Sequence, residues 1–434
     1  MPKGWEWSRL GTLFSTVTGS TPSTKDTSLY GDEYPFYKPN DLGAGFDVYS
    51  SEDTVSEKGY QSGRILPKYS VLVTCIGATI GKTGYIRNTG ICNQQINAIL
   101  PNAFLLPEYT YFCMCSEFEQ QQIWTNSSAT TLPILNKRKF DNLLFPVPSK
   151  SQQTLIVGRI KELLCFVEII QTEKVTLQET INSTKAKILD LAIRGKLVPQ
   201  DSNDEPASVL LERIRAEKEE LIKQGKIKRD KKESIIFKGD DNSYYRQTGN
   251  LIEPISDWEL DDIPDSWALC CLGEICDYGN CNNVEADSIT NNAWILDLED
   301  IEKDTGRVIK KIRKTERDFA STKHSFHKGQ VLYSKLRPYL NKVIIADENG
   351  FCTSEILPLD FSKVVLPQYA LYYLMSPTFL KYANRCSYGV KMPRLGTADG
   401  KKAIFPLPPL EEQYRISDCI SKIFMQIDTI SASI

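Results

Sequence analysis

The sequence is poor in the residues that build metal sites. It has only two histidines among 434 residues. Its twelve cysteines do not form the Cys-x-x-Cys pairs of structural zinc sites, since Cys113 and Cys115 are separated by one residue and Cys270 and Cys271 are adjacent. We therefore expect free, mostly buried thiols in a reducing compartment, and no metal ion.

Long apolar runs and a net positive charge are also missing. No apolar run reaches the roughly 18 residues that a membrane span needs, and the first residues lack the apolar segment of a signal peptide. We expect a cytoplasmic protein that does not contact membranes. The formal net charge is −3, so any contact with nucleic acid must depend on a local basic surface.

Common catalytic signatures are absent as well. The sequence has no nucleophile elbow, no His-Glu-x-x-His motif and no Asn/Asp-Pro-Pro-aromatic motif of an adenine methyltransferase. Gly77–Thr83 resembles a phosphate-binding loop, but three residues separate its glycines where four are needed. A tight turn between strands is the better interpretation. We expect no catalytic residue and no cofactor site in this chain.

What the sequence does contain is an internal repeat. Residues 70–86 align with residues 330–346, which places Lys82 over Lys342 at an offset of 260. The segment equivalent to Gly77–Thr83 lacks both glycines, which argues further against a nucleotide site. Other pairs at this offset are Gly90 and Gly350, Cys92 and Cys352, Leu106 and Leu366, Pro133 and Pro393, and Gln153 and Gln413.

Each half therefore follows one plan. A Trp-x-x-x-x-Leu-Gly motif is followed by a polar stretch, short β-rich runs broken by glycines, an aromatic-rich helix, a Phe-Pro-x-Pro motif and a long helix. We expect a first globular domain over 1–150 and a first long helix with a connector over 151–225. A linker and second globular domain follow over 226–408, and a short second helix over 409–434.

The two long helices carry the alternating four-three apolar spacing of a coiled coil. The first apolar series runs from Ile156 to Leu191, with Gly195 as a C-cap, and the second runs from Ile416 to Ile434. Matching apolar series favour packing of the two helices on each other. The alternative is that each helix lies on its own globular half.

The segment between the halves is strongly charged. Residues 205–222 are good helix formers, and the basic run Lys223–Lys232 follows them. Such a run is usually a solvated connector, but contact with a phosphate backbone or a partner remains open.

Polar and basic side chains recur at matched places in both halves. DNA recognition uses these types: Arg or Lys for guanine, Asn or Gln for adenine, and cations for phosphates. Lys335 and Arg337 interrupt a β-rich apolar run. Lys82 and Lys342 recur where their neighbours differ, so these two lysines are the best phosphate candidates. The framework repeats while the polar residues differ, which fits an asymmetric two-part DNA site. The candidate DNA-binding residues are Lys38, Asn40, Thr79, Lys82, Gln94, Gln95 and Lys137 in the first half, and Lys335, Arg337, Tyr339, Lys342, Lys391 and Arg394 in the second.

These motifs resemble the specificity subunit of type I restriction-modification enzymes over essentially the whole chain. The most specific segment is 189–218, and further matches are 5–11, 19–22, 333–342 and 408–413. The resemblance implies an α/β (α+β) fold with two repeated target-recognition domains separated by long antiparallel coiled-coil spacer helices. Each domain would read half of a bipartite, asymmetric site in the major groove, and the helices would act as a ruler for the gap.

The resemblance also implies partners. These are double-stranded DNA, two methyltransferase subunits that carry S-adenosylmethionine and methylate adenine, and two restriction/translocase subunits that use ATP and Mg²⁺. This chain would supply specificity alone, without catalysis or a cofactor.

One feature departs from the family pattern. The first spacer helix would span roughly 60 Å, whereas the second extends only about 27 Å beyond Ile416 at 1.5 Å per residue. The family usually has helices closer in length. Natural truncation, gene shuffling and completion of the pair by another chain are the three explanations.

Two functions of other classes remain open at this point. The first is a stand-alone NTPase that uses Gly77–Thr83, in which Lys82→Ala would abolish turnover. The second is a structural coiled-coil adaptor that does not touch DNA, in which charge reversal at Lys335 and Arg337 would leave DNA affinity unchanged.

Overall fold

The computed structural model describes residues 2–43, 45–128, 132–226, 234–241, 243–255, 263–361 and 363–433. Two compact units divide the chain, Met1–Thr172 (unit 1) and Glu173–Ile434 (unit 2). Ile434 and residues 227–233, which include most of the predicted basic run, lie outside the described residues.

Unit 1 is an α/β domain that begins and ends on paired strands. β1 (Glu6–Arg9) pairs antiparallel with β10 (Leu144–Val147), its register running from Glu6↔Val147 to Arg9↔Leu144. A five-stranded sheet has the order β2 (Thr16–Thr18), β9 (Ile96–Ile99), β6 (Val71–Thr74), β7 (Thr83–Ile86) and β4 (Asp47–Val48). A three-stranded sheet has the order β5 (Thr54–Val55), β3 (Tyr30–Tyr37) and β8 (Ile91–Cys92).

The helices of unit 1 begin where the sequence supplies caps. Ser116 accepts the backbone N–H of Glu119 at the start of one helix, and Asn136 accepts that of Lys139 at the start of another. A proline at the first position favours the helix that begins at Pro107. These helices and their neighbours are α1 (Leu10–Leu13), α2 (Glu57–Ser62), α3 (Pro107–Cys115), α4 (Glu117–Asn126) and α5 (Lys137–Asp141).

The core of unit 1 joins both ends of the domain. Phe145 on β10 lies edge-on to Phe14, with ring centroids 5.5 Å apart, and to Tyr109 on α3, at 6.0 Å. Phe140 and Leu10 are buried in the same cluster. Because these residues come from the first and last strands and helices, the domain closes on itself.

Unit 2 repeats this plan. β14 (Ala268–Cys271) pairs antiparallel with β25 (Ile404–Leu407), as β1 does with β10. A five-stranded sheet has the order β15 (Asn283–Val284), β18 (Lys323–Phe326), β21 (Gly350–Cys352), β16 (Trp294–Leu296) and β17 (Ile312–Arg313). The other strands are β20 (Val343–Ile345), β19 (Val331–Ser334) and β22 (Ile356–Leu359), in that order, and the pair β23 (Ser387–Tyr388) and β24 (Arg394–Leu395).

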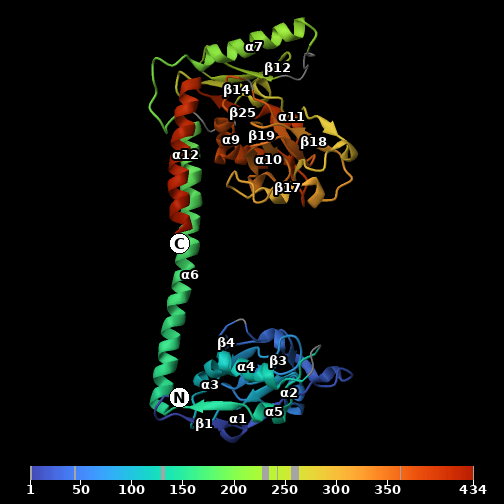
Figure 1. Ribbon diagram of the computed structural model, residues 1–434, viewed down its shortest axis with the longest axis vertical. Helices are drawn as coiled ribbons and strands as arrows, with labels where there is room; N and C mark the ends of the chain where they lie inside the picture. Colours follow the sequence, from blue (N-terminus) through green and yellow to red (C-terminus); the bar gives the residue numbers. More distant parts are fainter. Residues whose placement is uncertain are drawn as a thin grey trace. The chain divides into compact units, whose positions relative to one another are not determined.

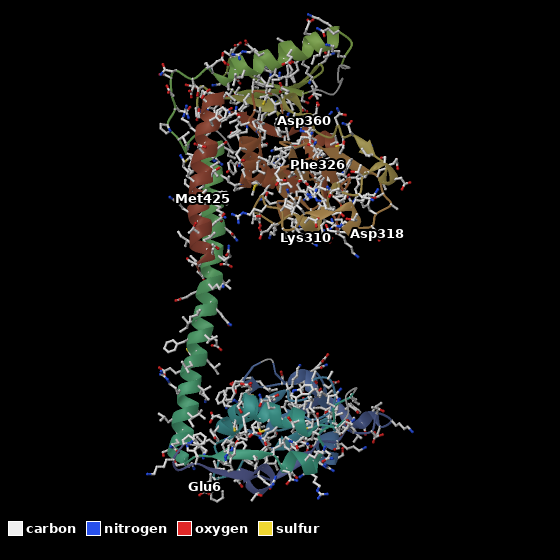
Figure 2. All side chains as sticks on the ribbon, viewed as in Figure 1. Glu6, Lys310, Asp318, Phe326, Asp360 and Met425 are labelled. Carbon is white, nitrogen blue, oxygen red and sulfur yellow. The ribbon has the colours of Figure 1, made fainter. Side chains whose placement is uncertain are left out.

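The helices of unit 2 and one aromatic contact complete its core. Phe326, which is labelled in Figure 2, is buried in unit 2. Its ring lies edge-on to the Trp294 ring, with 5.1 Å between the centroids. The helices are α8 (Leu272–Ile275), α9 (Pro367–Met375), α10 (Pro377–Arg385) and α11 (Thr397–Lys402).

The segment between the repeats contains a helix, as expected, and a sheet that the sequence analysis did not predict. α7 (Ala207–Lys223) precedes an antiparallel sheet of β11 (Ser234–Lys238), β12 (Tyr244–Thr248) and β13 (Leu251–Pro254). Ile236 on β11 is buried against Leu269, Cys271 and Ile404. This part of the connector is therefore attached to the folded domain of unit 2.

The first long helix, α6 (Lys150–Ile193), ends as the sequence predicts. Gly195 has a left-handed backbone (φ +66°), and the Lys196 N–H donates to the Leu191 carbonyl at 2.9 Å. This is a Schellman cap, which requires glycine or asparagine at the left-handed position.

The second long helix, α12 (Leu410–Ala432), packs beside the C-terminal part of α6 (Figure 1). Ile188 and Ile193 share a core cluster with Ile416 and Ile420. Lys185 pairs with Asp428, whereas Gln200, just after α6, bonds Glu412 at the start of α12. The helices therefore run antiparallel, and the predicted pairing is confirmed for this part.

The alternative, that each helix lies on its own domain, is also correct in part. Val157 near the start of α6 is buried in the core of unit 1. Phe424 on α12 lies edge-on to Tyr372 of α9. Farther along α6, Leu163 and Ile170 are exposed, and the buried members of the predicted apolar series, Ile181 and Ile188, lie in its C-terminal half.

Candidate nucleic-acid interface

The segment that resembles a phosphate-binding loop is a turn between β6 and β7. The Thr74 N–H donates to the Lys82 carbonyl at 2.8 Å, and the Gly81 N–H donates to Thr74 at 2.9 Å. Gly77 (φ +105°) and Gly81 (φ +89°) have left-handed backbones. A strand follows directly, so the helix N-terminus that cradles a phosphate has no place here. The predicted tight turn is confirmed.

Unit 2 forms the same turn without the glycines. The Ser334 N–H donates to the Lys342 carbonyl at 3.0 Å. Arg337 (φ +50°) and Asn341 (φ +48°) hold the left-handed positions that Gly77 and Gly81 hold in unit 1. The closing bond and the two left-handed positions are thus repeated even though the residues differ, whereas the Asn341 N–H donates to the Pro338 carbonyl and not to Ser334.

The turn in unit 1 is bonded to two other segments. The Cys75 N–H donates to the Gln95 carbonyl at 2.7 Å, and the Leu135 N–H donates to Cys75 at 2.8 Å. The Gly77 N–H reaches the Pro133 carbonyl at 3.0 Å. We call residues 75–82, 93–95 and 133–137 the first loop cluster.

Unit 2 has equivalent bonds 260 positions later. The Lys335 N–H donates to the Glu355 carbonyl at 3.0 Å, and the Leu395 N–H donates to Lys335 at 3.0 Å. The Arg337 N–H reaches the Pro393 carbonyl at 2.7 Å. We call residues 335–342, 353–355 and 391–395 the second loop cluster. These bonds bring most of the candidate residues of each half together.

Side chains of the first loop cluster are mainly neutral. Asn93 donates to the Gln95 amide oxygen at 2.9 Å and thereby orients this side chain. Thr21 donates to the Gln94 amide oxygen. Lys82 is exposed, and no ion pair of its ammonium is found among the described residues; Thr79 is half-buried beside it in the turn.

Three further candidates in unit 1 lie on other segments or have carboxylate partners. Lys38 pairs with Asp53, and Asn40 is exposed on the short η2 (Pro39–Asp41). Lys137, at the edge of the first loop cluster, pairs with Asp141 at 2.6 Å and donates to Thr16 at 2.6 Å. Contact of Lys38 or Lys137 with a phosphate would have to compete with these pairs.

The second loop cluster carries more charged side chains than the first. Arg394 donates to Glu355 through Nε at 3.0 Å and Nη2 at 2.9 Å, which fixes both groups. Lys335 is half-buried, and Tyr339 and Lys391 are exposed. The Nε atom of Arg337 is buried, and no hydrogen-bond partner for it is found in the described part of the chain.

Lys342 has different surroundings from Lys82. Its ammonium donates to the Leu298 carbonyl at 2.6 Å, and burial lowers the pKa of its side chain. The repeat aligns the two lysines correctly, but Lys82 is exposed whereas Lys342 is half-buried.

The orienting contacts of two polar residues and one exposed hairpin were not predicted from the sequence. Asn93 and Glu355 orient Gln95 and Arg394 from segments that the backbone bonds bring alongside. The hairpin of β23 and β24 exposes Tyr388, Val390 and Met392 around Lys391. The sequence signal that could have indicated this hairpin is Gly389, whose φ in the structure is +97°.

A family model described as "Type I restriction modification DNA specificity domain" matches residues 2–179 and 264–434. The chain belongs to this family. Membership confirms the expected α/β fold with two repeated domains, and it assigns the chain to DNA specificity and not to catalysis.

Similar proteins support the family membership. The EcoDI specificity subunit of Escherichia coli is 23% identical over 437 residues, which cover 100% of this chain and 84% of that relative. The EcoAI specificity subunit of Escherichia coli is 31% identical over 54% of this chain and 38% of its own length.

Two solved structures have the same fold. A chain from a study of complex assembly and conformational transition of the type I R-M system has a TM-score of 0.61 at 17% identity, covering 100% of this chain and 93% of that one. The HsdS subunit of Thermoanaerobacter tengcongensis has a TM-score of 0.53 at 16% identity, covering 100% and 92%.

The described residues also bear on the composition-based expectations. All twelve cysteines are free, and seven are buried, as predicted. Burial raises the pKa of the Cys75 thiol to about 12. No helix among the described residues is long and apolar enough to span a membrane, and none of their His, Cys, Asp and Glu side chains form a group suited to a metal ion.

Proposed function

We propose that this chain reads a bipartite, asymmetric site on double-stranded DNA, with one half-site for each unit, and directs the other subunits of a type I restriction-modification complex to it. The observation that carries the proposal is the pair of loop clusters. They share a backbone hydrogen-bond framework at an offset of 260 residues and differ in their side chains.

The side-chain chemistry supports two different half-sites. The first loop cluster offers amides and a hydroxyl, from Gln94, Gln95 and Thr79. The second offers cations and a carboxylate, including Lys335, Arg337 and Glu355. Amides suit adenine and guanidinium groups suit guanine, so two such sets select different bases.

The partners and cofactors in this proposal follow from the family. Two methyltransferase subunits would carry S-adenosylmethionine, and two restriction/translocase subunits would use ATP and Mg²⁺, all in the cytoplasm. This chain would hold none of these cofactors. The paired helices α6 and α12 would set the number of unread base pairs between the half-sites.

The test uses the chain with its own methyltransferase subunits in a host that otherwise lacks them. Single-molecule methylation sequencing should show one bipartite motif that is methylated throughout the genome and is lost when this chain is deleted. A genome without such a motif contradicts the proposal.

Purified complexes separate the proposal from the two other functions. The double variant Lys335→Glu, Arg337→Glu should lose DNA affinity, whereas unchanged affinity favours a structural adaptor. Nucleotide turnover by the isolated wild-type chain that Lys82→Ala abolishes would instead support the NTPase.

A further inference from the structure

The two units can be compared directly at four equivalent positions of the loop clusters, which we call a layer. Three of them are joined by the equivalent backbone bonds, and the fourth forms an equivalent β-bridge next to them; in unit 1 they hold Cys75, Gly77, Gln95 and Ile134. The same positions in unit 2 hold Lys335, Arg337, Glu355 and Arg394. One layer of the scaffold is therefore neutral in unit 1 and charged in unit 2.

Arg337 is the residue in this layer that its backbone accommodates least well. Its φ of +50° lies in the left-handed region, which costs a residue with a Cβ atom on the order of 1 kcal/mol. Unit 1 has glycine at the equivalent position, and the Gly77 N–H makes the equivalent bond, to the Pro133 carbonyl. The fold is thus satisfied by glycine, so the turn itself gives no reason for an arginine here.

The other charged groups of this layer either pair with each other or cannot donate two parallel hydrogen bonds. Both Arg394 and Glu355 are held in their mutual two-bond contact. Lys335 carries an ammonium, which acts as a point charge and cannot form a planar pair of parallel hydrogen bonds. Arg337 is the guanidinium of this layer whose Nε has no partner among the described residues.

We propose that Arg337 reads a guanine in the half-site bound by unit 2, and that Gly77 leaves unit 1 without this contact. The inference rests on the proposed function. Guanine presents two adjacent acceptors, O6 and N7, in the major groove, and a guanidinium can donate to both at once. The corresponding layer of unit 1 contains Gln95, whose amide matches adenine instead.

The variants come from the repeat itself. Arg337→Gly copies Gly77 and removes the guanidinium without straining the turn, and Arg337→Lys keeps the charge but loses the planar fork. Asn341→Gly is the matched control, because it copies Gly81 and changes the other left-handed residue of the same turn. Thermal unfolding of each variant checks that unit 2 stays folded.

The experiment uses the full chain assembled with its methyltransferase subunits. The motif is first determined by methylation sequencing. In one set of duplexes, each G·C pair of the half-site bound by unit 2 is changed to A·T in turn. In another set, each guanine of this half-site is replaced by 7-deazaguanine, which lacks the N7 acceptor. Binding is measured for every duplex and variant.

The wild type should lose about 5- to 150-fold in affinity at one guanine. Arg337→Gly should reduce this discrimination to within about twofold while preferences at other positions stay unchanged, Arg337→Lys should keep only part of it, and Asn341→Gly should retain it. Full discrimination by Arg337→Gly, equal weakening on all duplexes, or a second half-site without G·C pairs would overturn the inference. These results leave the proposed function intact, whereas a wild-type complex without any bipartite motif overturns both.

Discussion

At the scale of single residues, equivalent positions of the repeat have different environments. Lys82 and Lys342 follow the same turn, but Lys82 is exposed and Lys342 donates to a carbonyl. Glu119 on α4 is fully buried where unit 2 has the buried Phe379. In both cases the backbone position is equivalent, but the side chain differs in its identity or in its contacts.

The two lysines should therefore respond differently to truncation. Lys82→Ala should weaken binding of the complex to all duplexes by a similar factor and reduce the slope of log affinity against log salt by about 1, as loss of one phosphate contact does. Lys342→Ala should instead cost about 1–3 kcal/mol of stability, because it removes a charged hydrogen bond to Leu298. Salt titrations and urea unfolding of both variants make the comparison, and equal changes in salt slope would refute it.

Glu119 should make unit 1 less stable at alkaline pH. Its Oε2 accepts from Gln122 at 3.0 Å, Oε1 has no partner among the described residues, and burial raises the pKa of its carboxyl to about 8. Since the pKa of Glu119 in the folded state lies above the ordinary value of 4.5, the folded state binds the extra proton. Its contribution to stability is complete below about pH 4.5 and is lost as pH rises through about 8.

Glu119→Gln should remove most of this dependence. Unfolding measured between pH 5 and pH 9 should show the variant more stable than the wild type at pH 9 by roughly 2–4 kcal/mol. Glu117→Gln is the control, since Glu117 is exposed on the same helix. Equal pH profiles for the wild type and Glu119→Gln would show that Glu119 is not protonated in the fold.

At the scale of elements, α12 is held by one end of its apolar series. Ile416 and Ile420 are fully buried with α6 and α9, while Ile430 is 55% exposed. The buried Glu412 accepts from the Trp267 indole at 2.9 Å and from Gln200 at 2.6 Å. The first three turns of α12, as far as Ile420, therefore carry most of its attachment.

Truncations along α12 should reflect this gradient. Ile416→Ala should destabilise unit 2 by about 2–5 kcal/mol, because it leaves a cavity in a closed core. The same change at Ile430 should stay within about 0.5 kcal/mol, as for other exposed positions. Denaturant unfolding followed by a unit 2 probe measures both, and similar losses at the two sites would show that the exposed end is covered in solution.

At the scale of the whole molecule, the sequence was sufficient for features that depend on local or repeated patterns. The turn at Gly77 and the cap at Gly195 could be predicted because a short segment specifies each of them. The offset of 260 could be found because two segments of the chain resemble each other. The β11–β13 sheet could not, since its short strands are recognisable only through their pairing. The contact of Arg394 with Glu355, 39 positions away, likewise depends on the folded chain. Which of the thirteen candidate residues touch DNA remains a prediction.

The paired terminal strands of each domain have an evolutionary consequence. β1 and β10 lie side by side in unit 1, as β14 and β25 do in unit 2. The chain therefore enters and leaves each domain at two neighbouring strands. A recombination event with both crossovers at these strands would exchange a complete domain as a cassette. It would transplant one recognition specificity whole, so new combinations of half-sites could arise, provided that the incoming domain packs against the core residues of the retained helices, such as Val157 and Ile416.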